Sequence, residues 1–264
     1  MPELPDVEVF KQYLDSTSLH QTIRHVDVSN SKVLENTSAQ VFKNQLKDCQ
    51  FQSSSRQGKY LFVELSSGEW LVFSFGMTGS LKYFKNDDQM PDYPRIRFDF
   101  VNEFHLVYAS QRMLGKVMLT GDRKQFIEAH QLGLDAISPD LDESRFRQVM
   151  KGRRGMLKST LMNQHVIAGI GNVYADEILF HAGFHPKTSV KELDDNHFDT
   201  LFRAMQEVLQ VAIAHRADPE QLPNSYLLPH RHDGGKCPKC GESLQHIKVS
   251  GRTAYYCPQC QPKP

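Results

Sequence analysis

Four cysteines near the C-terminus constrain the fold of this chain more than any other feature. They form two Cys-x-x-Cys pairs, Cys237-Pro-Lys-Cys240 and Cys257-Pro-Gln-Cys260, with 16 residues between the inner cysteines. This spacing is typical of a tetrahedral zinc site built from four thiolates. We expect one structural Zn2+, because four cysteine ligands leave no open coordination position for catalysis.

The segment between the two pairs alternates apolar and polar residues and predicts a β-hairpin. Its strands are expected at 245–249 and 253–256, with Ser250-Gly251-Arg252 at the tip. An Arg at the end of a hairpin that a metal stiffens is well placed to bind a phosphate. Too few residues surround the pairs to form a hydrophobic core, so the metal must supply the folding energy of this segment.

Composition limits the class of protein. With 264 residues and 39% hydrophobic content, the chain can form one large or two ordinary domains. A mean hydropathy of -0.49 and the lack of an apolar run of about 18 residues argue against a membrane span. Acids and prolines stand where a signal peptide needs a basic start and an apolar block, so we expect a cytoplasmic protein, in which disulfides are disfavoured. Lys plus Arg equals Asp plus Glu at 31 each, so an anionic partner must be recognised by local charge.

The first half of the chain has the pattern of a β domain. After an opening helix with Val7, Phe10 and Leu14 on one face, short alternating runs are separated by turn-forming residues. The runs are 23–28, 59–65, 69–75, 95–101, 104–108 and 116–119. We expect an antiparallel sandwich or barrel within residues 1–130.

Three loops of this domain carry polar or exposed candidates. Lys59 follows a glycine turn at a strand edge, and Met77 stands in the glycine-flanked turn 76–79. An apolar side chain in such a turn could wedge into a base stack, although core packing is the alternative. The segment 110–115 carries Arg112 beside two apolar side chains and by itself reads as a loop.

The second half is helical and locally basic. Between 144 and 175 there are six basic residues and no Asp or Glu, which suits a phosphate backbone or, alternatively, a solvated face. The six are Arg145, Arg147, Lys151, Arg153, Arg154 and Lys158. Helices are expected at 143–150, 157–163 and 173–180, followed by a long amphipathic core helix at 194–214.

The turn Ala168-Gly-Ile-Gly-Asn172 separates two of these helices. Asn172 stands where the second helix begins, so the backbone N–H groups there have no intrahelical partner and can bind phosphate. A helix, a glycine turn and a helix beside a basic run indicate DNA binding.

The N-terminus Met-Pro-Glu-Leu-Pro-Asp suggests covalent chemistry. If Met1 is removed, Pro2 presents a secondary amine, and an α-amine has a reference pKa near 8, well below that of a lysine. Such an amine can attack a sugar C1′ and form an iminium ion, with Glu3 placed to handle protons or stabilise the cation. The alternative is an ordinary helix start, with a proline in the first turn and acids near the positive end of the dipole.

Together, in this order, these features resemble the formamidopyrimidine-DNA glycosylase and endonuclease VIII family of base-excision enzymes. The resemblance runs from Pro2 to Gln261. It is carried by Pro2-Glu-Leu-Pro5, Gly58-Lys-Tyr-Leu61, Gly76-Met-Thr-Gly-Ser-Leu81, Lys158, Gly169-Ile-Gly-Asn-Val-Tyr-Ala-Asp-Glu177 and the zinc hairpin with Arg252.

The resemblance implies an α+β fold in three parts. These are an N-terminal helix with an antiparallel β-sandwich at 1–130, a helix-two-turn-helix domain at 131–225 and a zinc-finger β-hairpin at 226–264. It further implies that double-stranded DNA with oxidised bases or abasic sites lies across the cleft between the domains. We expect a monomer in the cytoplasm, on the nucleoid if the source is bacterial.

The resemblance also implies roles. Pro2 would attack C1′, expel the base and form a Schiff base, while Glu3 acts as acid or base at the sugar. Lys59 would contact phosphate and assist β-elimination, and Arg252 would assist δ-elimination. Asn172 and Lys158 would hold the backbone around an extruded nucleotide, with Arg153 of the basic run as a further DNA contact.

Two departures concern specificity. The family fills the hole left by base extrusion with a Met, an Arg and an aromatic; Met77 and Arg112 match, but Leu114 stands where formamidopyrimidine glycosylases have Phe. The stretch 215–236 is short beside the family's lid over an oxidised purine. The Pro-Glu-Leu-Pro start favours oxidised purines such as 8-oxoguanine and formamidopyrimidines. Oxidised pyrimidines, or a non-catalytic protein that binds damaged DNA, are the alternatives.

Overall fold

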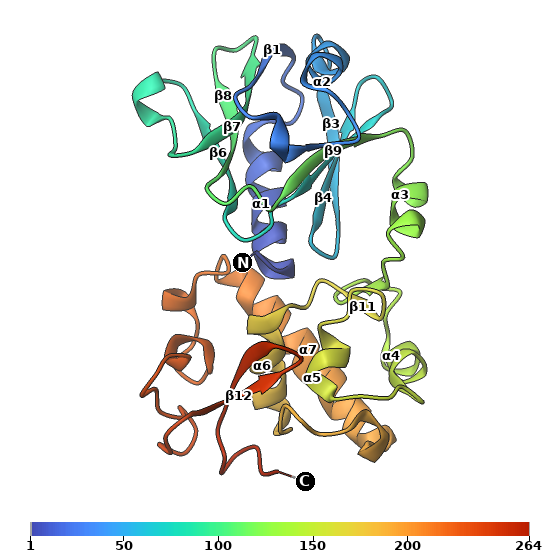
Figure 1. Cartoon of the computed structure of the whole chain (residues 1–264), viewed down its shortest axis with the longest axis vertical. Coiled ribbons are helices and arrows are strands. Elements are labelled where there is room, and N and C mark those ends of the chain that lie inside the picture. The colour runs from blue at the N-terminus through green and yellow to red at the C-terminus, as the bar shows by residue number, and fades with distance from the viewer. Residues whose placement is uncertain (1, 264) are drawn as a thin grey trace. The chain divides into compact units, whose positions relative to one another are not determined.

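The computed structural model of this chain describes residues 2–263 (Figure 1). These residues form two compact units. The first contains Asp6–His130 and Pro2, and the second contains Glu3–Pro5 with residues 131–263. Helix α1 (Leu4–Thr17) therefore begins with residues of the second unit and continues through the first.

The first unit is a sandwich of two sheets. One has the strand order β1-β7-β8-β6 and the other β2-β9-β5-β4-β3, with every pair antiparallel except β2 and β9. The strands are β1 (Ile23–Val28), β2 (Leu34–Glu35), β3 (Phe51–Gln57), β4 (Tyr60–Leu65), β5 (Trp70–Ser74), β6 (Gly79–Phe84), β7 (Pro94–Phe100), β8 (His105–Ser110) and β9 (Lys116–Thr120). All six runs expected from the alternation are strands, so the predicted antiparallel sandwich is confirmed.

The core of the first unit lies between the two sheets. Phe98 on β7 makes ring contacts with Phe73 on β5 at 6.3 Å and with Phe51 on β3 at 5.8 Å, and all three rings are fully buried. Helix α1 adds Val7 and Leu14 to the same core. The alternation in the sequence therefore places one face of each sheet against the other, as the burial of apolar surface requires.

Strand β3 was not expected, because its sequence Phe-Gln-Ser-Ser-Ser-Arg-Gln is polar. Its polar side chains are used by neighbours: Ser53 donates to Glu64 at 2.6 Å, and Arg56 Nε donates to Glu8 of α1 at 2.8 Å. Ser54 also donates a short hydrogen bond to Asp15 of α1. A sheet edge that packs against a helix through hydrogen bonds does not show the apolar alternation on which the prediction depended.

Other short elements of the first unit also lacked a clear pattern. They are α2 (Ala39–Leu46), α3 (Arg123–Ala129), the 3-10 turns η1 (Ser31–Val33) and η2 (Asp87–Gln89), and strands β2 and β6. Helix α3 buries only Phe126. Helices α2 and α3 bury two side chains and one, too few to reveal a period of 3.6 residues, and the buried positions of β6 (79, 81 and 84) do not keep a period of two.

The second unit is a helical domain followed by the cysteine-rich hairpin. Its helices are α4 (Glu143–Met150), α5 (Leu157–Leu161), α6 (Asn172–Ala182) and α7 (Asp195–Ala214). It also has the 3-10 turns η3 (Val190–Glu192), η4 (Pro219–Gln221) and η5 (Leu228–His230), and the parallel pair β10 (Leu134–Asp135) and β11 (Ile167–Ala168). The four helices were expected, with bounds that differ by at most two residues.

Helices α6 and α7 form the centre of this domain and lie side by side (Figure 1). Residues 174–180 of α6 are all buried, and α7 buries the stripe that its sequence predicted. That stripe is Phe198, Leu201, Met205, Val208, Leu209 and Ala212, with Phe202 partly buried.

The C-terminal hairpin consists of β12 (Gln245–Val249) and β13 (Arg252–Tyr256). Ser250 and Gly251 form its turn, both with positive φ (48° and 77°), which is the backbone of a two-residue type I′ connection. Arg252 pairs with Val249, so it is the first residue of β13 rather than part of the turn. Among residues 2–263, no helix has the length and apolar character needed to cross a bilayer.

Candidate active site and metal centre

Glu3 is held at the N-terminus of α6. Its side chain is buried, and its carboxylate accepts three backbone hydrogen bonds. Gly171 N–H donates to Oε2 at 2.8 Å, Val173 N–H to Oε1 at 2.9 Å and Tyr174 N–H to Oε2 at 3.1 Å. The positive end of the helix dipole also favours an anion here. Three donors fix both oxygens of the carboxylate in position.

The glycines of the turn permit this approach. A Cβ on Gly171 would lie 2.2 Å from Cδ of Glu3, and a Cβ on Gly169 would lie 2.5 Å from Cδ1 of Leu4. The carbonyl of Gly169 also accepts the N–H of Leu4 at 3.0 Å. Both positions therefore require glycine because the turn packs closely against the N-terminal residues, and not only because the turn is tight.

These contacts change one expectation. The backbone N–H groups at the start of α6 were expected to bind phosphate, but Gly171, Val173 and Tyr174 donate to Glu3 instead. Asn172 itself begins α6, and its Oδ1 is buried without a hydrogen-bond partner among the described residues. A phosphate contact at this position is therefore left to Asn172 itself, whose backbone N–H is not among the donors to Glu3.

Pro2 directly precedes Glu3 in the chain and is partly buried. Because Glu3 and Leu4 are bound to the turn before α6, the backbone position of Pro2 is restrained through its peptide bond. Met1 lies outside the described residues, so its predicted removal has no counterpart in this structure.

Lys59 lies in the turn between β3 and β4, beside Gly58. The Gly58 carbonyl accepts a hydrogen bond from Arg56 Nη1 at 3.0 Å, and Arg56 is in turn bound to Glu8 of α1. The ion pair is mostly buried, with 5% of the Arg56 side chain exposed. The hairpin tip that carries Lys59 is therefore fixed to α1.

The loops that carry Met77, Arg112 and Leu114 lie together in the first unit. Thr78 Oγ1 accepts the N–H of Arg112 at 3.0 Å. A Cβ on Gly76 would lie 2.3 Å from N of Gly115, so the two backbones are in direct contact. Met77 is 41% exposed and Leu114 54% exposed. The structure thus brings two solvent-exposed apolar side chains and one Arg to adjacent loops, and excludes core packing for both.

The basic run is partly neutralised by acids distant in sequence. Arg147 binds Asp199 at 2.6 Å and Lys151 binds Asp195 at 3.3 Å, both on α7. Arg153 remains exposed beside an open hollow of about 420 Å3. Its lining residues are Gly152, Arg153, Arg154, Gly155, Ser159, Thr160, Asn163 and Val166. Two Arg residues and three polar side chains at one hollow suit an anionic group.

Lys158 does not fit its predicted role as a direct DNA contact. Its side chain is 0% exposed, and its ammonium group donates to Asp176 of α6 at 2.5 Å. Burial lowers the pKa of Lys158 and raises the pKa of Asp176, while the attraction between the two opposes both shifts. A side chain without exposed surface cannot reach a phosphate, so the predicted contact of Lys158 is incompatible with this arrangement.

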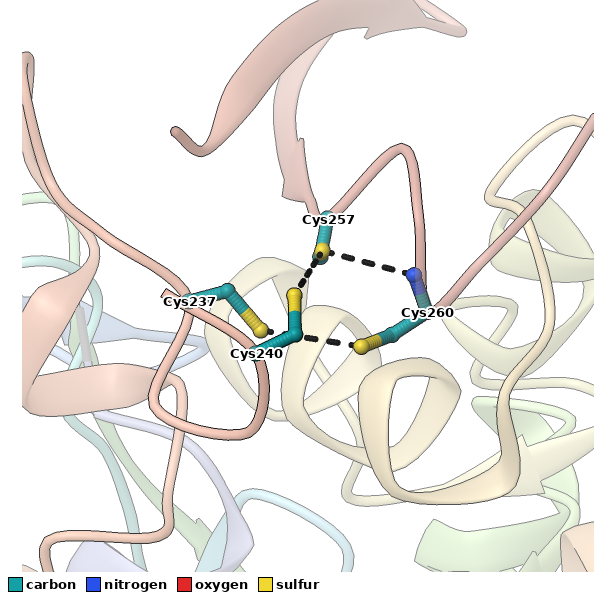
Figure 2. A group of neighbouring side chains, drawn as sticks. All are labelled: Cys237, Cys240, Cys257 and Cys260. Atoms are coloured by element: carbon teal, nitrogen blue, oxygen red, sulfur yellow. Dashed lines mark hydrogen bonds between the residues drawn. The ribbon is translucent and has the colours of Figure 1, made fainter. Parts of the chain in front are cut away.

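The four cysteines at 237–260 converge from two turns (Figure 2). Cys237 Sγ lies 3.8 Å from Cys260 Sγ, Cys240 Sγ lies 3.5 Å from Cys257 Sγ, and all four sulfurs are within 4.8 Å of one another. A Zn–S bond of 2.3 Å in tetrahedral geometry places the sulfurs about 3.8 Å apart. The four thiols therefore fit one tetrahedral zinc ion.

Arg252 is exposed at the start of β13, and its Nη1 lies 3.9 Å from the sulfur of Met162, the residue after α5. The hydroxyls of Ser159 on α5 and Ser250 in the hairpin turn are 2.7 Å apart. The end of the hairpin that carries Arg252 therefore lies on α5.

Comparison with known proteins decides the family. Three family models match successive parts of the chain: the formamidopyrimidine-DNA glycosylase N-terminal domain over residues 1–117, the formamidopyrimidine-DNA glycosylase H2TH domain over 132–222, and a zinc finger found in FPG and IleRS over 234–263. A formamidopyrimidine-DNA glycosylase of Desulforamulus reducens is 34% identical over 99% of both chains. The chain belongs to the formamidopyrimidine-DNA glycosylase family. A second relative of that name, from Acaryochloris marina, is 34% identical over the full length of both proteins.

Solved structures of the formamidopyrimidine-DNA glycosylase of Lactococcus lactis have the same fold. The enzyme bound non-covalently to DNA with an abasic site superposes with a TM-score of 0.88 at 28% identity, covering 99% of this chain and 100% of that one. Its complex with DNA containing Fapy-dG has a TM-score of 0.87 at 27% identity, with the same coverage. The predicted family and fold class are confirmed, and the zinc-finger match together with the four thiols confirms one structural zinc site.

Some residues of this family member were missed by reasoning from the sequence. Asp176 and Glu177 stand in the motif 169–177 that carries the resemblance, but the sequence predicted no role for either. Arg231 lies in the stretch 215–236, of which only the length entered the prediction. Glu177 accepts the N–H groups of Leu227 at 2.8 Å and Leu228 at 2.7 Å. Two adjacent acids within the otherwise apolar or aromatic run 173–180 were the available signal, because buried carboxylates need partners.

Proposed function

We propose that this chain is a bifunctional base-excision-repair enzyme, a DNA glycosylase and abasic-site lyase that removes oxidised bases from double-stranded DNA. The observation that carries the proposal is the position of Glu3, whose buried carboxylate is fixed by three N–H donors directly after Pro2. An ordinary helix start, the alternative for this segment, does not require a buried carboxylate held by three N–H donors. A carboxylate held beside the candidate nucleophile is what proton transfer at the sugar requires.

The chemistry begins at Pro2 once Met1 has been removed. The secondary amine attacks C1′, and the bond between C1′ and the base breaks. The carboxylate of Glu3 accepts the proton that the amine loses and passes it to O4′ as the C1′–O4′ bond opens, so that C1′ becomes the carbon of an iminium ion. The departing base takes its proton from solvent. The resulting iminium ion acidifies the hydrogen at C2′. Its loss expels the 3′ phosphate by β-elimination, assisted by Lys59, and δ-elimination of the 5′ phosphate follows with help from Arg252.

DNA binding is assigned to residues of both units. In the first unit Met77, Arg112 and Leu114 would occupy the space left by the extruded nucleotide. In the second, Asn172 begins α6 and is partly buried, and its backbone N–H and side-chain amide would donate to a phosphate oxygen. Arg153 beside its hollow is a further phosphate contact. Lys158 is assigned no direct contact.

The relatives support a substrate class and a domain organisation for this chain. The complexes of the Lactococcus lactis enzyme contain abasic sites and Fapy-dG, which supports oxidised purines ahead of oxidised pyrimidines.

We propose a catalytic domain at 1–130, a helix-two-turn-helix domain at 131–225 and a zinc finger at 226–264, supported by the unit break at 130/131 and by the family matches. The protein would act as a monomer in the cytoplasm, on the nucleoid in a bacterium.

Borohydride trapping tests the proposal. Incubation of the protein with a duplex containing 8-oxoguanine and with borohydride should give a covalent adduct, since reduction fixes the Schiff base. Protease and nuclease digestion followed by mass spectrometry should find the sugar remnant on Pro2. Pro2→Gly should lose the adduct, whereas Pro219→Gly, at an exposed proline of η4, should trap like the wild type.

Four outcomes would overturn all or part of the assignment. An adduct on another residue, or cleavage by a protein whose intact mass shows Met1 fully retained, would exclude the Pro2 mechanism. Salt-dependent binding to abasic duplex without trapping or strand scission would instead indicate a non-catalytic binder of damaged DNA. Faster excision of thymine glycol than of 8-oxoguanine in a panel of single-lesion duplexes would assign the chain to pyrimidine lesions.

A further inference from the structure

A buried ionic cluster joins the helical domain to the hairpin that carries Arg252. Its centre is the carboxylate of Asp176 on α6, which has 0% exposed side-chain surface. Oδ1 accepts from Lys158 Nζ at 2.5 Å, and Oδ2 accepts from Arg231 Nε at 3.0 Å and from the backbone N–H of Tyr255 at 3.1 Å. One carboxylate therefore binds α5, the segment at 231 and strand β13.

The two cations of the cluster also bind β13 directly. The carbonyl of Thr253 accepts from Lys158 Nζ at 3.3 Å and from Arg231 Nη2 at 3.4 Å. The guanidinium of Arg231 lies 4.8 Å from the ring centre of Tyr255. Thr253 and Tyr255 are thus held by their backbone and by a ring contact, on the strand that begins with Arg252.

A zinc ion bound by the four cysteines would hold only the end of β13 that leads into Cys257. Cys257 follows β13 directly, and Arg252 stands five residues before it, about 16 Å away at 3.3 Å per residue. The hydrophobic cluster around the cysteines is small, with Phe180 and Leu227 as its buried members besides Cys237 and Cys257. The Asp176 cluster contacts the strand next to Arg252, so the two attachments hold opposite ends of β13.

The cluster is also electrostatically close to the proposed catalytic acid. Burial lowers the pKa of Lys158, and the negative charge of Glu3 is among the influences that oppose this shift. The same helix α6 provides the N-terminal donors for Glu3 and, one turn later, Asp176. Through α6, the positions of Glu3 and of β13 are therefore set by one rigid element.

We propose that Asp176 and Arg231 are positioning residues that, with Lys158, hold β13 so that Arg252 is placed for the elimination step it assists. This inference rests on the proposed function. It goes beyond it in giving a role to three buried or half-buried charges that do not touch substrate. Their effect should appear in the step that uses Arg252 more than in formation of the Schiff base at Pro2.

The test compares product distributions on an abasic duplex under single-turnover conditions. We expect Asp176→Asn to lower the ratio of β,δ-product to β-product at least ten-fold, with the rate of borohydride trapping within about two-fold of wild type. Arg231→Gln, at a side chain with 16% exposure, removes one contact of the same cluster and should lower the ratio in the same direction. It supplies a second measurement of the product ratio if Asp176→Asn does not fold.

Asp199→Asn is the matched control. It breaks the ion pair with Arg147 between α4 and α7, in the same domain but away from the hairpin, and should leave the product ratio unchanged. A normal ratio in folded Asp176→Asn or Arg231→Gln would overturn the inference. So would an equal fall in trapping, β-product and β,δ-product, because that pattern indicates general destabilisation. A wild-type protein that forms no adduct would instead refute the proposed function itself, which distinguishes the two failures.

Discussion

The position of the Glu3 carboxylate depends on the hydrogen bonds that its two oxygens accept. Its two oxygens receive three N–H groups, two at Oε2 and one at Oε1. In a glutamine the amide nitrogen would face at least one of these donors, because each of the two oxygens accepts at least one N–H. Glu3→Gln would therefore change the fit as well as the charge, so its loss of activity would not by itself assign proton transfer to Glu3.

Gly171→Ala tests this geometry without touching the carboxylate. The new Cβ would lie 2.2 Å from Cδ of Glu3, so either Glu3 or the turn must move. A displacement of about 1 Å at a reacting group can reduce the rate about 100-fold. We expect excision of 8-oxoguanine to fall by about that factor, measured by single-turnover gel assay.

Gly121→Ala is the control, because no atom lies within 4 Å of the added Cβ. It should excise at the wild-type rate. Full activity of Gly171→Ala, with an unchanged melting temperature, would show that the close contact between Gly171 and Glu3 has no catalytic importance.

At the level of elements, the two loops that carry Met77 and Leu114 act as one surface. The Thr78 to Arg112 hydrogen bond and the backbone contact at Gly76 bind them to each other. If both loops insert into the base stack as proposed, their backbones are already fixed to each other and lose less freedom on binding.

Replacing Leu114 tests the wedge. An aromatic ring stacks on a base with about 1–3 kcal/mol, which corresponds to roughly five-fold or more in affinity. We expect Leu114→Phe to bind an abasic duplex at least five-fold more tightly, and Leu114→Ala to bind it several-fold more weakly. Fluorescence anisotropy at one fixed salt concentration, with each of the four bases opposite the abasic site, measures both.

Val101→Ala removes a side chain of similar exposure, 53%, from another part of the first unit. It should not change the affinity. If the wild type, Leu114→Phe and Leu114→Ala bind the abasic duplex with equal affinity, whichever base is opposite the abasic site, contact between Leu114 and the base stack is excluded.

For the whole molecule, the two compact units differ in what stabilises them. The sandwich has a continuous aromatic core, whereas the segment around the cysteines has only a small cluster of buried side chains. A segment of this size needs its metal to remain folded. The units should therefore respond differently to loss of zinc.

Removal of zinc by a chelator should unfold the hairpin and leave the sandwich intact. Hydrogen exchange followed by mass spectrometry should show faster exchange across 237–261 and unchanged protection in β4, β5 and β7. Addition of Zn2+ should restore protection, with Mg2+ as the control because it prefers oxygen ligands. Undiminished protection of β12 and β13 in metal-free protein would show that protein contacts alone fold the hairpin.

Much of this arrangement follows from local patterns. The cysteine spacing, the glycine turn, the amphipathic helix 195–214 and the six alternating runs were readable because each depends on neighbours in the sequence. Pro2, Glu3, Lys59, Met77, Arg112, Leu114, Arg153, Asn172 and Arg252 remain predictions that await the experiments above. Strand β3 was hidden, because its polar residues serve partners on α1.

Tertiary contacts decided what the local pattern left open. The basic run suggested a surface for DNA, yet Lys158 is buried against Asp176, and Arg147 and Lys151 are paired with α7. The free N–H groups expected before α6 are used by Glu3, which is 168 residues from Gly171 in the sequence. Residue type and spacing specify which groups can carry charge and bind metal. Only the folded chain specifies which charges meet, because desolvation and pairing depend on neighbours that are distant in the sequence.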